Sequence, residues 1–246
     1  NTLTPDTMRT RLIAAALILF FLPQFAANAQ IARLYESRYN FTNSQIRDVY
    51  QDRNGFIWVC GENGLTRFDG RHFRTLSYNR EDEDGIASSS VLCMLEDSSG
   101  NNWIGTARGL QLFDKDYGTF RLFDLGDPEI PESTQYVSDI IEIDEGGSYT
   151  VIAATSQHGA YFIDEKTLEV DRSRTEKINI GLSSLYIEDI FRDSRNLLWI
   201  ASAISGLDIY DLGSERPLRV PGMELMKQEA AITAFEEDDK SGDLFI

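Results

Sequence analysis

The chain has 246 residues, of which 40 are Asp or Glu and 23 are Lys or Arg, so its formal net charge is −17 at pH 7. A surface this acidic repels phosphate groups, which argues against nucleic-acid binding. Hydrophobic residues make up 42% of the chain, and its two cysteines are too few for a disulfide scaffold or a CxxC-type zinc site. We therefore expect a packed core without covalent crosslinks.

The first predicted element is a secretory signal peptide. A short basic stretch precedes eleven apolar residues at Leu12–Leu22, and Ala27 and Ala29 form an A-x-A cleavage site. Eleven residues rise about 16 Å as a helix, roughly half of a bilayer core, which disfavours a transmembrane anchor. We expect residues 1–7 to be upstream read-through and residues 8–29 to be a signal peptide that directs export.

The rest of the chain is a tandem repeat. Each copy carries a turn aspartate, and these fall at Asp52, Asp97, Asp144, Asp193 and Asp239, at intervals of 45 to 49 residues. Downstream of each aspartate is a slot that holds all three tryptophans of the chain, and its occupants are Trp58, Trp103, Ile152, Trp199 and Phe245. Because every tryptophan falls at one position of the repeat, the repeat is secure.

Each copy predicts four strands. In the first copy, strands are expected at residues 46–51, 56–61, 65–68 and 73–76, separated by Asn-Gly and Asp-Gly turns. A unit of this length with four strands and a recurring aromatic residue is typical of a β-propeller blade, and a stacked β-solenoid is the alternative. No helical apolar spacing appears after residue 30, so we expect an all-β fold of four-stranded antiparallel blades.

The repeat phase divides the chain. A lead-in strand is expected at 30–45, followed by blades at 46–90, 91–136, 137–186 and 187–231 and by a truncated fifth blade at 232–246. The third blade is degenerate. About four and a half blades do not close a ring, so we expect the chain to be an N-terminal fragment of a longer propeller.

The marker residues of the repeat have expected structural roles. The tryptophans should pack between neighbouring blades, and the bend glycines should supply positive φ angles at Gly64, Gly109, Gly159 and Gly206. The aspartates Asp52, Asp97 and Asp193 should cap their own turns, because one turn aspartate per blade does not form a cation cage. Cys60 and Cys93 are expected to be two separate buried thiols, with a disulfide as the alternative.

The pattern D-x-x-G-x-x-W-[VI]-G-T-x-x-G-L-x-x-[FY]-D resembles the two-component regulator propeller repeat. The best copy runs from Asp97 to Asp114, whereas the first copy departs at Cys60 and Glu62. The resemblance implies the periplasmic sensor half of a hybrid two-component regulator of the Bacteroidetes type. It further implies an oligosaccharide ligand, no cofactor, and as partners the remaining blades, a cytoplasmic histidine kinase and response regulator, and a second copy in a homodimer.

No catalytic motif is recognisable, and His72 and His158 lie about two repeats apart. The sequence therefore predicts a ligand-sensing module rather than an enzyme. The alternatives are an exported polysaccharide-active propeller enzyme, a protein-interaction propeller, and the sensor of a diguanylate cyclase.

The binding face follows from topology. In a four-stranded meander, the bends between the second and third strands emerge at the same end as the connections between blades. The connections expected at 77–90, 125–136 and 175–185 are long, and long loops on a rigid scaffold carry most ligand contacts. Hydrogen-bonding side chains on these bends are the predicted ligand-binding residues, namely Asn63, Arg108, Gln157 and His158.

Overall fold

The computed structural model describes residues 41, 43, 45–126, 135–202, 204–218, 232, 235–238 and 240–246. The predicted read-through, signal peptide and most of the lead-in lie outside these residues. In the described part, no helix is long and apolar enough to cross a membrane.

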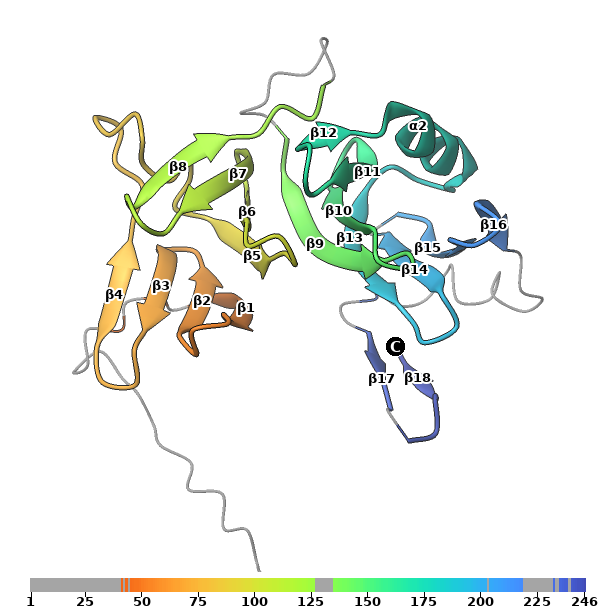
Figure 1. Ribbon diagram of the computed structural model, residues 1–246, viewed down its shortest axis with the longest axis horizontal. Helices are drawn as coiled ribbons and strands as arrows, with labels where there is room; N and C mark the ends of the chain where they lie inside the picture. Colours follow the sequence, from red (N-terminus) through yellow and green to blue (C-terminus); the bar gives the residue numbers. More distant parts are fainter. Residues whose placement is uncertain are drawn as a thin grey trace, which may run out of the picture. The chain divides into compact units, whose positions relative to one another are not determined.

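The described chain forms four antiparallel sheets of four strands, and in each sheet the strands follow one another in chain order (Figure 1). Blade 1 consists of β1 (Ile46–Gln51), β2 (Ile57–Gly61), β3 (Gly64–Phe68) and β4 (Phe73–Leu76). Blade 2 consists of β5 (Val91–Glu96), β6 (Asn102–Thr106), β7 (Gly109–Asp114) and β8 (Thr119–Leu122). The prediction of four-stranded propeller blades is confirmed, and a solenoid is excluded.

The second half of the chain repeats this plan. Blade 3 consists of β9 (Val137–Asp144), β10 (Tyr149–Thr155), β11 (Gly159–Asp164) and β12 (Glu169–Val170), followed by helix α2 (Arg172–Gly181). Blade 4 consists of β13 (Ile187–Arg192), β14 (Leu197–Ser202), β15 (Gly206–Asp211) and β16 (Arg216–Leu218). A two-stranded sheet follows, formed by β17 (Glu236–Glu237) and β18 (Leu244–Phe245).

The turn aspartate of each tryptophan-containing blade binds both its turn and its tryptophan. Asp52 Oδ1 accepts hydrogen bonds from the N–H groups of Asn54 and Phe56, while its Oδ2 accepts one from Trp58 Nε1 at 2.8 Å. The same indole bond joins the equivalent pairs at 2.6 Å in blade 2 and 2.9 Å in blade 4, Trp103–Asp97 and Trp199–Asp193. The predicted turn caps are confirmed, and the bond to the indole is an addition to them.

The bends between the second and third strands require glycine. Gly64 and Gly109 have φ angles of +112° and +113°, and Gly159 and Gly206 also have positive φ, as expected. A Cβ atom at Gly64 would collide with the backbone oxygen of Leu76. These bends therefore tolerate only a residue without a side chain.

The core lies between the blades. Trp58 of blade 1 packs edge-on against Phe113 of blade 2, with ring centroids 5.6 Å apart, in a cluster shared by the two blades. Fully buried Trp103 lies in the cluster between blades 2 and 3, and Ile152 occupies the corresponding place between blades 3 and 4. Trp199 is only partly buried, so its packing against a fifth blade stays a prediction. In the described part of the chain, only the short β17–β18 hairpin follows blade 4.

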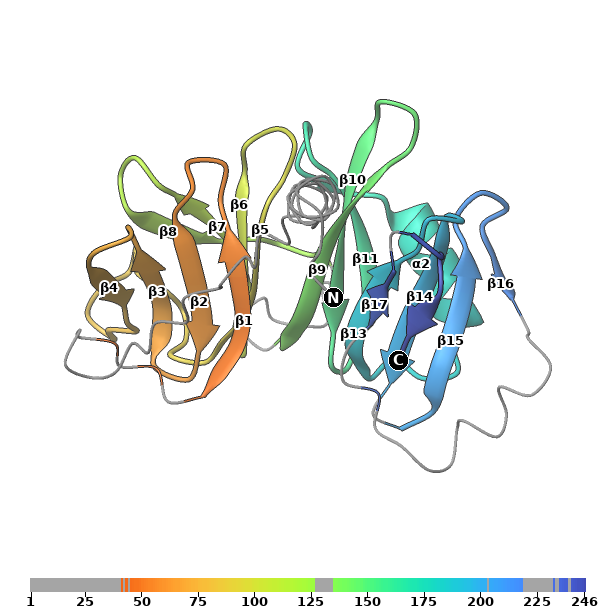
Figure 2. The same ribbon diagram turned by 90° about the horizontal axis from the view of Figure 1, so that it is seen from below.

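Polar bonds also join each turn to the next blade. Ser98 in the turn of blade 2 donates its N–H and Oγ–H to the Glu142 carboxylate of blade 3, at 2.5 and 2.9 Å. Ser194 in the turn of blade 4 makes the same two bonds to Glu237, at 2.8 and 2.6 Å. Because Glu237 belongs to β17, this strand occupies the place of the first strand of a fifth blade (Figure 2).

Helix α2 is an addition to the predicted all-β fold, and the connection predicted at 175–185 begins inside it. The helix replaces most of an outer strand. Asn179 accepts a hydrogen bond from Ala160 N at 2.9 Å and donates one to Ala160 O at 3.1 Å, while Thr175 Oγ1 accepts from Phe162 N at 3.0 Å. Two side chains one helical turn apart thus pair with the edge of β11, and β12 is correspondingly short.

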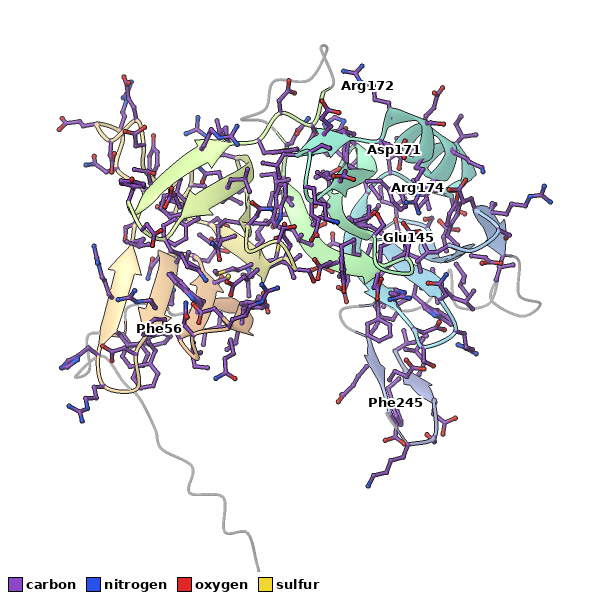
Figure 3. The ribbon with its side chains drawn as sticks, viewed as in Figure 1. Phe56, Glu145, Asp171, Arg172, Arg174 and Phe245 are labelled. Carbon is purple, nitrogen blue, oxygen red and sulfur yellow. The ribbon has the colours of Figure 1, made fainter. Side chains whose placement is uncertain are left out.

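Ionic contacts hold α2 in this position. Arg174 donates to both carboxylate oxygens of Glu145 at 2.8 Å, pairs with Glu215 at 3.2 Å, and lies 4.4 Å from the centroid of the Phe162 ring. Figure 3 shows Arg174 on the side of α2 that faces Glu145. Asp171 caps the helix by accepting from Arg174 N at 3.0 Å.

Candidate functional site

The bends and the interblade connections meet on one face, as predicted. Ala107 of the blade 2 bend donates its N–H to Ser90 O at 3.1 Å, and Ser156 of the blade 3 bend donates to Tyr136 O at 2.9 Å. In both pairs the acceptor belongs to the connection that enters the same blade. We call this end of the blades the loop face.

A cavity of about 680 Å³ lies along the outer edge of blade 2, between the 77–90 connection and β8, and it reaches the loop face at Arg108. We call it the Arg108 cavity, and its lining includes Tyr78, Asp82, Arg108, Gln111 and Tyr117. The Arg108 guanidinium lies 5.9 Å from the centroid of the Tyr78 ring. The backbone of the bend is fixed by a bond of 3.0 Å from Arg108 N to Thr106 Oγ1.

The lining of the Arg108 cavity suits a polar ligand with apolar faces. Tyr117 is 83% exposed and Tyr78 is 39% exposed, so both rings offer flat surfaces to solvent. Arg108 supplies hydrogen-bond donors in a planar fork, and Asp82 supplies acceptors. Aromatic surface combined with charged hydrogen-bonding groups can hold a hydroxyl-rich molecule in a fixed orientation.

A second cavity of about 400 Å³ lies on the loop face of blade 3, beside α2. We call it the His158 cavity, and its lining includes His158, Arg172 and Glu176 together with Leu125 and Leu185. His158 is positioned by a bond of 3.0 Å from its backbone N–H to Thr155 Oγ1. In Figure 3, Arg172 lies on the opposite side of α2 from Glu145.

The structure distributes the four predicted ligand-binding residues rather than bringing them together. Arg108 and His158 each line a cavity. Asn63 receives a different role, because its N–H donates to Asn43 Oδ1 at 2.8 Å and its carbonyl accepts from Ser77 Oγ at 3.1 Å. Gln157 is exposed at the tip of its bend. Ligand binding by any of the four stays a prediction.

Two features of the innermost strands were not anticipated from the sequence. The first is a cluster of charged side chains around Arg47, near the start of these strands. Arg47 of β1 donates to the Glu62 carboxylate at 3.0 and 2.7 Å, and it lies within electrostatic range of Tyr136 and Glu188. The hydrogen bond from Arg47 lowers the pKa of Glu62.

The second feature is one repeat position of these strands that holds three aspartates and one cysteine, namely Asp48, Cys93, Asp139 and Asp189. Asp48 Oδ2 accepts from Met94 N of the next blade at 3.3 Å, and Asp139 Oδ2 accepts from Ile190 N of the next blade at 3.1 Å. These aspartates therefore link successive innermost strands. The common position is visible in the repeat alignment, but its partners are not.

Asp139 and Asp189 form a carboxyl pair. The two carboxyl groups interact with each other, and the pKa of each is raised, mainly by burial. Burial, together with the neighbouring charge of Asp189, raises the pKa of Asp139 well above its usual value. No group of three or more metal-ligating side chains occurs among the described residues.

The cysteines are free and buried, as expected. Burial raises the pKa of both the Cys60 and the Cys93 thiol well above the usual value. Neither thiol therefore has the thiolate character that reactive cysteines need at neutral pH.

Comparison with known proteins agrees with the predicted repeat. The family model described as two component regulator propeller matches residues 40–63, which span β1 and β2. No curated protein gives a significant match. The predicted resemblance to the two-component regulator propeller repeat is confirmed.

Solved structures share the fold, and two of them are extracellular domains of two-component systems. The extracellular domain described as belonging to the hybrid two-component system BT3049 from B. thetaiotaomicron superposes with a TM-score of 0.71 at 20% identity, over 86% of this chain and 28% of that one. The corresponding domain of BT4673 from the same organism gives 0.68 at 20% identity, over 85% and 29%. The chain thus spans less than a third of the length of either structure.

Proposed function

We propose that this chain is part of an extracytoplasmic sensor propeller that binds an oligosaccharide on its loop face and signals to a histidine kinase and response regulator. The observation that carries the proposal is the Arg108 cavity. It reaches the face selected from topology at Arg108, and it combines exposed aromatic rings with a guanidinium and carboxylates. The fold shared with extracellular domains of two-component systems supports a sensing role over a catalytic one.

Export and glycan recognition are parts of the same proposal. The basic stretch, apolar run and A-x-A site of residues 8–29 support secretion. The net charge of −17 disfavours polyanionic ligands at the bulk surface and is compatible with neutral sugars. The remaining blades, the cytoplasmic output domains and a second copy of the protein are the proposed partners.

Titration calorimetry with a panel of neutral and acidic oligosaccharides tests the proposal. At least one panel member should bind the full chain. Substitution of the cavity residue, Arg108→Ala, should then weaken that ligand about tenfold or more, which corresponds to the loss of one charge-assisted hydrogen bond. Arg74→Ala is the matched control, because Arg74 is an exposed arginine of β4 outside the Arg108 cavity.

The outcomes separate the parts of the proposal. If Arg108→Ala and Arg74→Ala bind the ligand with equal affinity, the ligand does not bind in the Arg108 cavity. The same measurement on His158→Ala would then test the His158 cavity. Failure of every oligosaccharide to bind would contradict glycan sensing. Turnover of a panel member would instead favour the enzyme alternative.

A further inference from the structure

One position of the repeat lies close to the loop face in every blade. It is the third residue of the third strand in each blade, directly after the bend glycine and one apolar residue. The four residues at this position are Thr66, Gln111, Tyr161 and Asp208. They differ in size, charge and polarity, so the fold of the blade does not dictate their identity.

In blade 2 this residue holds the connection that enters the blade. Gln111 is only 2% exposed. Its Oε1 accepts a hydrogen bond from Ala87 N at 2.8 Å, and its Nε2 donates to Gly85 O at 3.4 Å. Both partners belong to the 77–90 connection, so one buried amide side chain satisfies two backbone groups of that loop.

In blades 1 and 4 the equivalent residue also forms hydrogen bonds with the segment that leads into its blade. Asp208 accepts from Ser183 N at 2.8 Å and from Ser183 Oγ at 2.7 Å, and Ser183 lies in the connection that enters blade 4. Thr66 Oγ1 accepts from Asn43 Nδ2 at 3.1 Å, and Asn43 precedes blade 1.

Blade 3 uses an apolar version. Tyr161 shares a buried cluster with Leu125, which begins the connection into blade 3, and both residues line the His158 cavity. In all four blades, therefore, the residue at this position contacts or packs with the segment that leads into its own blade.

A physical reason favours a dedicated anchor. A connection that runs over the end of a blade has no strand partner for its N–H and C=O groups, and leaving such groups unpaired in a buried place is costly. A side chain from the third strand reaches them without extending the sheet. The chemistry of that side chain then has to match the particular loop.

We propose that this repeat position is a loop-positioning position, and that Gln111 sets the conformation of the 77–90 connection and with it the shape of the Arg108 cavity. Gly85 and Ala87 line this cavity together with Gln111. Tyr78, the ring beside Arg108, belongs to the same connection. Ligand selectivity would accordingly be determined partly by a residue that is almost completely buried.

Single-residue amide exchange, followed by NMR on the full chain, tests the loop part of the inference. Gln111→Met keeps the size of the side chain but removes both hydrogen bonds, so protection of Ala87 N should fall about tenfold. Gln111→Glu keeps an acceptor for Ala87 N and should retain most of that protection. Protection of Ser183 N should stay unchanged in both variants.

Asp208→Leu provides the reciprocal control. It should release Ser183 N and leave Ala87 N protected, because Ser183 is bonded to Asp208 and Ala87 to Gln111. The inference is overturned if Gln111→Met leaves Ala87 N protected. It is also overturned if Gln111→Met lowers protection at Ala87 and Ser183 alike, because that pattern reports general destabilisation.

The selectivity part rests on the proposed function and has a separate readout. If two panel members bind, Gln111→Met should change the ratio of their affinities. Gln111→Glu should keep this ratio close to that of the unsubstituted chain. A change confined to amide exchange would overturn only the selectivity part. If no oligosaccharide binds, the proposed function fails, while the exchange result still decides whether Gln111 positions the loop.

Discussion

Blades 2 and 3 are neighbours that reach the same four-stranded plan with different residues. In blade 2, the buried Asp97 receives the indole N–H of Trp103 at 2.6 Å, and the tryptophan is fully buried against blade 3. In blade 3, the slot holds Ile152, which has no polar hydrogen to donate, and Asp144 instead accepts from Gly147 N at 2.8 Å. The aspartate–tryptophan pair is therefore one solution to packing a blade rather than a condition for it.

The outer edges of the two blades differ as well. Blade 2 ends in the four-residue strand β8, whereas blade 3 has the two-residue strand β12 and then α2. Thr175 and Asn179 of the helix form hydrogen bonds with the backbone of β11. Without these bonds, the outer edge of β11 would need a longer partner strand. The comparison indicates that a blade requires a filled interblade core and a satisfied outer edge, while the residues that supply them can vary.

The largest expected effect concerns the aspartate–tryptophan pair. Asp97→Ala removes the acceptor for the buried Trp103 Nε1 and for the partly buried Asn101 N, so it should lower the free energy of unfolding by about 2–4 kcal/mol. Asp144→Ala, at the equivalent and exposed position, should cost much less. Urea unfolding of both variants measures the difference. Equal losses would mean that the two turns are supported in the same way.

A medium effect is expected at the helical edge. Asn179→Ala leaves the N–H and C=O of Ala160 without these side-chain partners, and the free energy of unfolding should fall by about 1–3 kcal/mol. Glu176→Ala, on the exposed side of the same helix, is the control for helix propensity and should be nearly neutral. If the two variants behave alike in urea unfolding, α2 does not act as an edge of the sheet.

The smallest effect is a pH dependence of the joint between blades 3 and 4. The raised pKa of Asp139 means that the folded state keeps a proton that the unfolded state has lost, so this group lowers stability as pH rises from about 4 through the raised value. Asp189→Asn removes the like charge and can donate to Asp139. Because both side chains are partly exposed, we expect a gain of only about 1 kcal/mol at pH 7.

At the joint between blades 2 and 3, Cys93 takes the place of the aspartate, so the same pH effect is not expected there. Unfolding in urea at pH 4 and at pH 8 should show a smaller difference in Asp189→Asn than in the unsubstituted chain. An unchanged difference would contradict an interaction between the carboxyl groups of Asp139 and Asp189.

The repeat could be recognised from sequence because its constraints are local. Gly64 and Gly109 occupy bends that only glycine can adopt, and the turn aspartates bind N–H groups within four residues of themselves. Such short-range requirements recur at fixed intervals in every copy. The loop face followed from topology alone, and two of the four predicted side chains, Arg108 and His158, line cavities on it.

The unpredicted features depend on contacts between distant segments. The face of α2 that packs on β11 includes Thr175, Ile178 and Asn179, and only Ile178 is buried and apolar, so no hydrophobic period reveals the helix. The pairing of Asp139 with Asp189 joins residues 50 positions apart on neighbouring blades. Cys93 conceals the same repeat position in blade 2, because it breaks the acidic pattern.

Helix α2 also affects how the rim of the molecule meets other chains. Among the described residues, no further strand pairs with the outer edge of β4, β8 or β16. Each of these strands carries an exposed arginine, at Arg74, Arg121 and Arg216, in a chain of strongly negative charge. Charged residues on sheet edges discourage pairing with a foreign strand. Blade 3 has no such arginine on β12, but its edge is covered by a helix. The rim thus resists aggregation by two means, charge on three blades and steric cover on the fourth.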